Sequence, residues 1–530
     1  MASRFTIPLF LLSACIPGLH AQPAENNDST HLFDIHAAVT ANAGTGNFAP
    51  YYNMSEHYGK IQQTNGIQGF IEINRPFLGS YFHNSYKAPA KRFDYGFGAE
   101  AMAEYTSSTD YLKYNAPTGE FEKISRHPGR ISLRQLWAGV KWRSLHLTAG
   151  MREHTPLCTP TLGSGDLVYS RNARPIPQVR IGFADFQDIP FTNGWVQIFG
   201  DISYGRFADS DYLESHYNYY NSFITTGVYM QYSRIYFNIA QGRRFSGTIG
   251  MQHATQFGGT WHQYRQGEEW SVIHNPVHFK DFINAFFPWS GGSSQVQGET
   301  DYFNGNHLGS WDLRLNYAID DAKTLSVYLQ SPWEDGSGIG KLNGFDGVWG
   351  ICYLSGTQPA VSQIVVEYVD LTNQSGPSHW APGDYDDSGI PGQATGADDY
   401  YNNYMYDGWA NYGMAIGSPF VKSPVYNTDG YLRFTDNRVR GFHIAAEGYI
   451  SKALQWQAMF SFRTSWGTPM LPAIEKRRDT SMMAGISWAI PKVKRLTLSG
   501  QLAFDTGELY GDNFGGMLTL RYSLPVFRKK

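Results

Sequence analysis

Leu496-Thr-Leu-Ser-Gly-Gln-Leu-Ala-Phe504 is the stretch that indicates the fold most clearly. Every second residue from Leu496 to Phe504 is apolar or glycine, whereas Thr497, Ser499 and Gln501 alternate with them. Side chains alternate across a β-strand, so the two sets lie on opposite faces. One face therefore suits lipid and the other suits a polar lumen, which is typical of a strand in a membrane β-barrel.

The same alternation recurs on both sides of this stretch. It is found in residues 442–450, 456–462, 482–490 and 517–527. Short connections at 451–454 and 491–495 alternate with longer polar stretches at 464–480 and 505–514, which we expect to be loops. Short turns at one end and long loops at the other are typical of outer-membrane barrels. The alternative is a soluble β-sandwich, which has little use for His443, Glu447 and Arg463 on a buried face.

The last predicted strand, Met517 to Phe527, ends in an aromatic residue. It resembles the terminal strand that the barrel-insertion machinery recognises, although three basic residues follow Phe527. Pro525 fits only near a strand end, where its missing N–H is tolerated.

Composition agrees with an all-β membrane protein. Aromatic residues make up 15% of the chain and charged residues 17%, and the mean hydropathy is −0.38. After the first residues no stretch approaches the 18 or so apolar residues of a transmembrane helix. The net charge of −4 and the lack of a basic block argue against nucleic acid as a partner.

The first 21 residues read as a signal peptide. Arg4 gives a positive start, 5–19 are mostly apolar, and Leu19-His20-Ala21 offers a cleavage site. The mature chain, 22–530, is then one barrel domain. A short membrane anchor and a lipoprotein site at Leu12-Ser13-Ala14-Cys15 are the alternatives. Whether the two remaining cysteines, Cys158 and Cys352, pair is left open.

Earlier segments are less regular. We expect a hairpin of 130–142 and 145–151, and strands at 228–241, 311–319, 324–330 and 361–369. Phe279 to Phe287 is the one convincing short helix and should pack in or beside the barrel. Gly376 to Asp399, rich in Gly, Pro, Asp and Ser, should be a long loop.

Several blocks in the second half of the chain, and one in the first, resemble the Wzi-type capsule assembly proteins. They are Ser170–Pro177, Gly305–Gly309, Tyr328–Gly338 with Asn343 and Asp346-Gly347, Gln374–Pro377, Asp399–Asn403, Gly408-Trp409 and Gly417–Phe420. They occur in the family's order, and the resemblance covers nearly the whole mature chain; Trp409–Tyr412 is a looser match.

The resemblance implies a monomeric outer-membrane barrel of about 18 strands, with a lumen occluded by loops and a short helix. It further implies a surface lectin that holds or organises capsular or other surface polysaccharide, with outer-membrane lipid around it. Neither catalysis nor a metal or cofactor is implied. A periplasmic helical bundle found in some members is not evident here.

The residues at the motif positions are chemically compatible with that role. Sugars are bound by flat aromatic faces together with amide, guanidinium and carboxylate groups. Each candidate could instead brace a plugged lumen, which is the commoner role of such side chains in barrels. The candidates are Arg171, Asn172, Arg174, Trp333, Glu334, Asp335, Asn343, Asp346, Tyr400, Asn402, Asn403 and Trp409.

Other functions fit less well. Glu334 and Asp335 are adjacent, so on a strand they point to opposite faces and cannot flank one glycosidic bond. Asp384 to Gly389 mimics a calcium loop, but Thr395 stands where a bidentate Glu is needed. The histidines at 253, 262, 274 and 278 lack zinc-site spacing. A diffusion channel for small solutes or sugars is the main alternative function.

Overall fold

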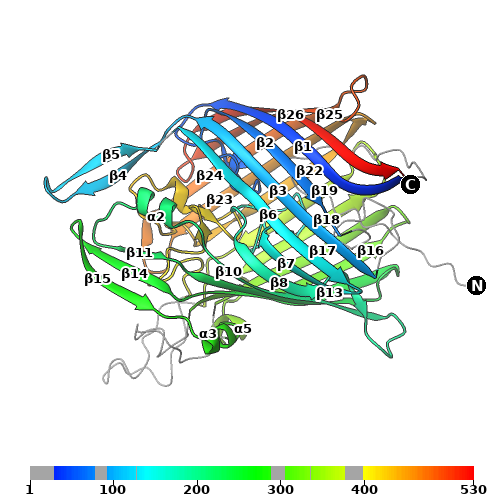
Figure 1. Cartoon of the computed structure of the whole chain (residues 1–530), viewed down its shortest axis with the longest axis horizontal. Helices are drawn as coiled ribbons and strands as arrows, with labels where there is room; N and C mark the ends of the chain where they lie inside the picture. Colours follow the sequence, from blue (N-terminus) through cyan, green and yellow to red (C-terminus); the bar gives the residue numbers. More distant parts are fainter. Residues whose placement is uncertain are drawn as a thin grey trace, which may run out of the picture.

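The chain forms a closed ring of antiparallel strands (Figure 1). The structure is a computed structural model and describes residues 29–77, 92–126, 128–287, 305–334, 336–375 and 398–529. Within these residues nineteen strands form one sheet, and β26 (Asn513–Lys529) pairs with β1 (Ser29–Gly44) to close it. β8 (Pro177–Phe183) and β9 (Gln187–Asp188) occupy one position beside β10 (Val196–Arg206), so the ring has 18 positions. The predicted antiparallel barrel of about 18 strands is confirmed.

The remaining strands of the ring follow one another in chain order. They are β2 (Gly66–Arg75), β3 (Phe93–Thr106), β6 (Gly129–Trp142), β7 (Leu145–Met151), β12 (Tyr229–Ile239), β13 (Phe245–Phe257), β16 (Asn306–Ala318), β17 (Lys323–Trp333), β18 (Gly347–Ser355), β19 (Gln363–Asp370), β22 (Val439–Ser451), β23 (Leu454–Gly467), β24 (Pro472–Ala489) and β25 (Leu496–Gly507).

Shorter elements lie in the connections. A hairpin is formed by β4 (Asp110–Asn115) and β5 (Glu120–Ser125), and a small sheet by β11 (Phe223–Thr226), β14 (Gly259–Arg265) and β15 (Glu268–Asn275). β20 (Ala410–Asn411) pairs with β21 (Met414–Ala415). The helices are α1 (Tyr51–Met54), α2 (Ser210–His216), α3 (Phe279–Asn284), α5 (Gly336–Ile339) and the 3-10 helix η2 (Pro424–Tyr426).

The two ends of the barrel differ. The connections at 143–144, 240–244, 319–322 and 452–453 are short, and they lie at the end where β1 begins and β26 finishes. The connections at 45–65, 152–176, 207–228 and 371–438 lie at the opposite end, from which β4–β5 and β14–β15 project (Figure 1). We call this opposite end the loop end. In outer-membrane barrels the long loops face the outside of the cell.

The outward faces of the strands carry an apolar belt. On β24 the alternating residues Met482, Ile486 and Trp488 are exposed, and on β26 so are Leu518 and Leu520. Large apolar side chains are exposed in this way when lipid rather than water surrounds them. The alternation predicted for 442–450, 456–462, 482–490 and 496–504 lies within β22 to β25.

One expected loop is wrong. Residues 464–480 were expected to be a loop, but β23 continues to Gly467 and β24 begins at Pro472, with Thr464 paired to Arg478. Polar residues are tolerated here because a strand that extends beyond the lipid no longer needs an apolar outward face. The loop expected at 505–514 is likewise shorter, since β25 ends at Gly507 and β26 starts at Asn513.

Pro525 lies where the sequence required it. β26 pairs with β25 only as far as Tyr522, whereas its pairing with β1 continues past Pro525 to Lys529. Pro525 therefore has a strand neighbour on one side only, and its missing N–H interrupts no pairing with β25.

Much of the lumen is packed with buried side chains. Side chains from the 152–176 and 371–438 connections, such as Val168, Trp409 and Phe434, join wall residues such as Val348 and Val365 in one buried apolar cluster. The polar lumen expected from the alternation holds only for part of the wall. Elsewhere the loops form the core of the molecule.

The predicted short helix exists as α3, but it packs beside the barrel and not in the lumen, because its Phe282 contacts the outward-facing Tyr204 and Tyr229. The helix inside the barrel is α1, whose Tyr51 to Met54 are all buried. A helix as short as α1 leaves no periodic signal in the sequence, because four residues complete little more than one turn.

Three further expectations can be compared with the structure. Cys158 and Cys352 are both free and buried, so they do not form a disulfide with each other. In the described part of the chain no helix is long and apolar enough to cross a membrane. The predicted signal peptide, 1–21, and most of the predicted 376–399 loop, with its calcium-like Asp384 to Gly389, lie outside the described residues.

Candidate functional site

The residues that follow β17 anchor the start of the 398–438 segment. Asn343 donates from its side-chain amide to the Pro332 carbonyl (2.7 Å) and to the Tyr400 hydroxyl (2.9 Å). The Glu334 carboxyl accepts the backbone N–H groups of Asp399 (3.1 Å) and Tyr401 (3.2 Å). Burial raises the pKa of Glu334 well above its usual range, and the carboxyls of Asp398 and Asp399 raise it further.

Asp346 performs the same task for the segment after β19. Its two carboxyl oxygens accept the backbone N–H groups of Asn373 (3.0 Å) and Gln374 (2.7 Å). The Gln374 side chain in turn accepts the Tyr400 N–H (3.0 Å). Glu334, Asn343 and Asp346, which lie close together in sequence, are therefore joined in one network with Tyr400, which follows more than fifty residues later.

Two further predicted residues shape the loop that follows. Asn402 and Phe434 form a reciprocal pair, in which the Asn402 amide donates to the Phe434 carbonyl (2.9 Å) and accepts its N–H (2.9 Å). The Asn403 side chain accepts the Met405 N–H (2.8 Å). These contacts set the course of the backbone and hold 402–406 against 434.

Trp409, Arg171 and Asn172 lie inside the lumen. The Trp409 indole donates to the Val168 carbonyl (2.8 Å), and the Asn172 amide donates to the Ala415 carbonyl (3.0 Å). Arg171 pairs with Glu56 at 2.9 Å. These bonds join the connections at 45–65, 152–176 and 371–438 to one another inside the barrel.

Arg174 and Trp333 lie apart from the lumen network. The Arg174 guanidinium stacks on the Tyr412 ring at 4.4 Å and donates to the Leu133 carbonyl. Trp333 continues the outward alternation of Leu325 and Val327, and its ring stacks on His253 at 5.3 Å. Asp335 lies outside the described residues. Trp349 of β18 faces outward and is exposed.

The motif residues that the structure describes thus have protein partners, and Trp409, Asn343 and Tyr400 are almost fully buried. A polymer outside the barrel cannot reach such side chains while the loops are in place. Their observed contacts are those of braces that hold the loops in the lumen.

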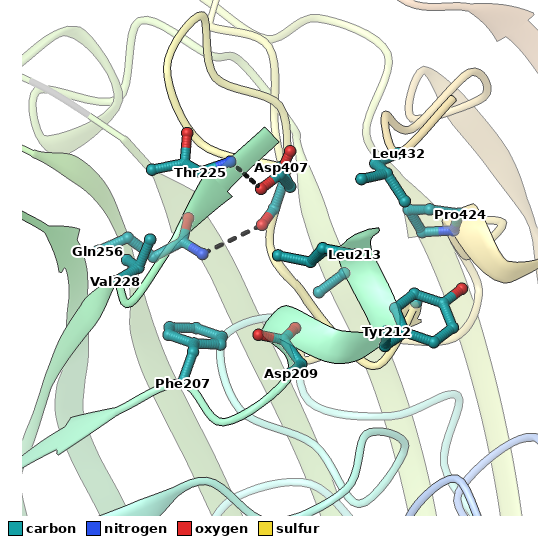
Figure 2. Close-up of a pocket in the computed structure, with 13 residues that line it drawn as sticks. Phe207, Asp209, Tyr212, Leu213, Thr225, Val228, Gln256, Asp407, Pro424 and Leu432 are labelled. Atoms are coloured by element: carbon teal, nitrogen blue, oxygen red, sulfur yellow. Dashed lines mark hydrogen bonds between the residues drawn. The ribbon is translucent and has the colours of Figure 1, made fainter. Parts of the chain in front are cut away.

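A cavity of about 20 Å³, room for a single water molecule, lies between the 207–228 and 371–438 connections (Figure 2). Phe207, Leu213 and Val228 are among its apolar lining, and Asp209 and Asp407 contribute carboxyl groups. Asp407 accepts the Thr225 N–H at 2.8 Å, and Asp209 accepts the Tyr412 N–H at 3.3 Å. The cavity is too small for a sugar ring.

The charged form of both carboxyl groups is disfavoured. Burial raises the pKa of Asp209 to about 6. Burial raises the pKa of Asp407 well above its usual range, and the nearby Asp209 adds to that rise. In the described residues no group of three or more His, Cys, Asp or Glu side chains is placed to hold a metal ion.

Aromatic side chains gather on the projecting elements of the loop end. Tyr114 and Phe121 of the β4–β5 hairpin and Tyr220 form a triad with ring centroids 4.8 to 5.3 Å apart. Tyr219 and Tyr264 meet at right angles, 4.8 Å apart. We call these five residues the aromatic layer.

The aromatic layer is partly exposed and carries polar neighbours. Phe121 is 43% exposed. The Lys113 ammonium lies 4.8 Å from the Tyr219 ring, the Asn115 amide donates to Glu122 (2.6 Å), and Glu269 accepts from the Tyr264 hydroxyl (3.3 Å). Flat rings beside ammonium, amide and carboxyl groups are the combination that binds sugars.

The layer was missed in the sequence. The aromatic run Tyr217-Asn-Tyr-Tyr220 was a signal, but its partners Tyr114, Phe121 and Tyr264 are far from it in the chain. Backbone bonds bring them together, such as Tyr114 N–H to the Asn218 carbonyl at 2.8 Å and Tyr264 N–H to the Ser222 carbonyl at 2.8 Å.

The fold defines a class: a closed 18-strand antiparallel barrel of the outer-membrane type, here with a lumen filled by its own loops. No family model and no curated protein sequence matches the chain. Among solved structures, Escherichia coli Wzi, described as an outer membrane protein involved in group 1 capsule assembly and as a carbohydrate binding beta-barrel, is similar over 94% of this chain and 85% of its own, with a TM-score of 0.52 and 11% identity.

Two other similar structures are weaker matches in TM-score. OccK5 (OpdH) of Pseudomonas aeruginosa covers 94% of this chain and 99% of its own (TM-score 0.44, 8% identity). OccAB4 of Acinetobacter baumannii covers 95% and 100% (TM-score 0.43, 10% identity). At these identities the likeness concerns the fold alone and does not assign the chain to the Wzi-type family.

Proposed function

We propose that this protein is a non-catalytic outer-membrane lectin of the Wzi type, which binds capsular or other surface polysaccharide at its loop end and holds it at the cell surface. The polymer is bound by the aromatic layer and its polar neighbours, and the motif residues hold the loops that carry that layer.

The observation that supports this proposal most is the filled lumen. Trp409, Ile416 and Phe434 are fully buried among loops and wall, where a diffusion channel would need open space. In a barrel whose lumen is filled by a packed core, that core supports the surface at the loop end.

The composition of the loop end supports the same role. Sugar rings stack on aromatic faces through their C–H groups, and their hydroxyls bond to amide, carboxyl and ammonium groups. Tyr114 and Phe121 pair on one face of the β4–β5 hairpin, where Tyr220 joins them, and Lys113 and Glu122 pair on its other face, so aromatic and polar groups are both present within one short hairpin and its neighbour. Wzi, a barrel of similar fold, is described as carbohydrate binding, which agrees with this proposal.

The first test measures binding of purified surface polysaccharide from the source strain to the protein in lipid nanodiscs. Replacing Phe121 and Tyr220 by Ala should weaken binding about tenfold, or about 1.4 kcal/mol. The matched control replaces the exposed Leu471, in the β23–β24 connection, and Ile474, at the start of β24, by Ala and should bind normally. Unchanged binding in the first variant, or equal loss in both, would contradict the proposal.

The second test separates the lectin from the channel. The purified protein in planar bilayers should give no steady conductance, because its lumen is packed. Sustained single-channel currents from the intact protein would instead support a diffusion channel.

A further inference from the structure

Helix α3 lies against the outer wall of the barrel, where lipid would otherwise be. Its Phe282 ring packs on Tyr204 of β10 (5.3 Å), Tyr229 of β12 (6.0 Å) and Phe257 of β13 (5.5 Å). The Tyr204 hydroxyl also donates to the Phe282 carbonyl at 2.6 Å. Tyr204 and Tyr229 share the outward face of their strands with Ile202 and Ile235, since side chains alternate along a strand.

The wall beside α3 is polar on its outward side. Along β13 from the exposed Ile249 toward the loop end, the same face of the strand carries His253 and Thr255. The register places His307 of β16 opposite Thr255. His253 and His307 are 2.9 Å apart at their ring nitrogens and stack with centroids 5.1 Å apart. Each of these three residues is nearly fully buried.

The inner side of α3 covers this polar patch. The Thr255 hydroxyl donates to the Ala285 carbonyl, just after α3, at 2.8 Å, and Ala285 and Asp281 are buried. The side of α3 that faces the protein therefore combines Phe282 with small and polar groups, which satisfy polar groups of the wall.

The opposite side of α3 and of the turn that follows it is apolar and partly exposed. Phe279 is 82% exposed, Ile283 50%, Phe286 36% and Phe287 39%. These four residues follow one another at intervals of four, three and one positions, so their side chains form a single stripe on a helix. A helix on a water-exposed surface turns such a stripe inward. Here the stripe points away from the protein.

We propose that α3 lies in the outer leaflet of the membrane, with Phe279, Ile283, Phe286 and Phe287 among the acyl chains of the lipid. The stripe then continues the apolar belt of the same strands, Ile235 of β12 and Ile249 of β13, across a stretch where the wall itself is polar. The exposed Lys280 can reach lipid phosphate, as cationic side chains of interfacial helices do. This inference does not depend on polysaccharide binding.

The test places an environment-sensitive NBD probe on Ile283→Cys in the mature protein, reconstituted in phosphatidylcholine vesicles. Leu518→Cys, in the belt, is the lipid reference, and Thr118→Cys, in the exposed β4–β5 connection, is the water reference. Cys158 and Cys352 are buried and should remain unlabelled. The probe at 283 should emit at shorter wavelength, and lipid-borne nitroxide should quench it at least half as strongly as the probe at 518.

Iodide quenching at 283 equal to that at 118, without nitroxide quenching, would overturn the proposal. Protection from both quenchers that rises with protein concentration would also overturn it, since a second copy of the chain would then cover the stripe. As a further check, Ile283→Asp should reduce nitroxide quenching of a probe on Phe286→Cys at least twofold. Unchanged quenching would show that the stripe does not hold the helix in lipid.

Discussion

At the scale of single residues, buried carboxyl groups decide where the loops lie. Asp346, Glu334 and Asp407 each accept backbone N–H groups from a distant segment, so each holds a loop by hydrogen bonds that water can no longer provide. A backbone donor left unpaired in such a place costs about 1–3 kcal/mol. The motif residues therefore contribute to the shape of the loop end without being exposed on it.

Asp346→Ala should loosen the segment after β19. The substitution removes the acceptor of the Asn373 N–H, at an exposed residue, and of the buried Gln374 N–H, and the buried donor alone costs about 1–3 kcal/mol. Hydrogen exchange at these two amides, followed by mass spectrometry, should be faster in the variant, whereas Asp346→Asn, which keeps one acceptor, should fall between. If the two amides of Asp346→Ala exchanged at the wild-type rate, the carboxyl would not be what holds the loop.

Asp209 should make the segment at the start of α2 sensitive to pH. Its pKa is raised to about 6 in the folded protein, above the ordinary value of 3.8, so the folded state binds the proton more tightly. The free energy of opening should then fall as pH rises from about 4 to about 6, by about 1–3 kcal/mol in total.

In Asp209→Asn this loss is absent, and the protection of the 209–213 amides, corrected for intrinsic exchange, should depend less on pH. The Asp407 carboxyl is retained in the variant, so any pH dependence that Asp407 contributes to the free energy of opening remains in both proteins. An identical pH profile in the wild type and Asp209→Asn would contradict the assignment.

At the scale of elements, one strand passes through two environments. β24 carries Ile486 in the belt and Ile474 near its loop-end tip, both on the outward face and both exposed. The sequence from Pro472 to Thr480 resembles a polar loop because this part of the strand lies beyond the lipid. There the alternation of apolar and polar residues is no longer imposed. The pairing of β23 with β24 nevertheless continues through Arg478 to Pro472.

Ile486→Arg should destabilise the barrel in bilayers by about 2–4 kcal/mol, because a guanidinium replaces an apolar group inside the lipid. Ile474→Arg, twelve positions away on the same face, should cost close to nothing, because it is in water. Urea titrations of both variants in phosphatidylcholine vesicles measure the difference. Equal costs would mean that the membrane does not lie where the belt indicates.

At the scale of the whole molecule, the ring is closed between the two ends of the chain. β1 pairs with β26 over most of their length, and the buried hydroxyls of Thr40 and Thr519 meet at 2.9 Å across this seam. The packed lumen then supports the wall from inside. Closure removes the exposed strand edges that would otherwise pair with other chains.

Thr40→Cys with Thr519→Cys should form a disulfide on mild oxidation, since the two side chains are already in contact. Thr40→Cys with Ser499→Cys, one strand further round the ring, should not. Peptide mass spectrometry of the oxidised proteins distinguishes the two. A bridge in the second pair but not the first would show that the strands close in a different order.

The sequence alone predicted the features that repeat. Alternation in residues such as Leu496 to Phe504 is imposed locally by the contrast between lipid and lumen, so the strands, the barrel and the position of Pro525 could be read from short windows. Helix α3 was found in the same way, from the spacing of its phenylalanines.

Tertiary structure alone decided what fills and covers the barrel. Glu334 meets Tyr401, Asn172 meets Ala415 and Tyr114 meets Tyr220 only after the ring has closed and the loops have folded into it or across its end. Such contacts leave no period in the sequence. The side of the wall on which α3 lies is also invisible there, because a short apolar stripe looks the same whether protein or lipid will cover it.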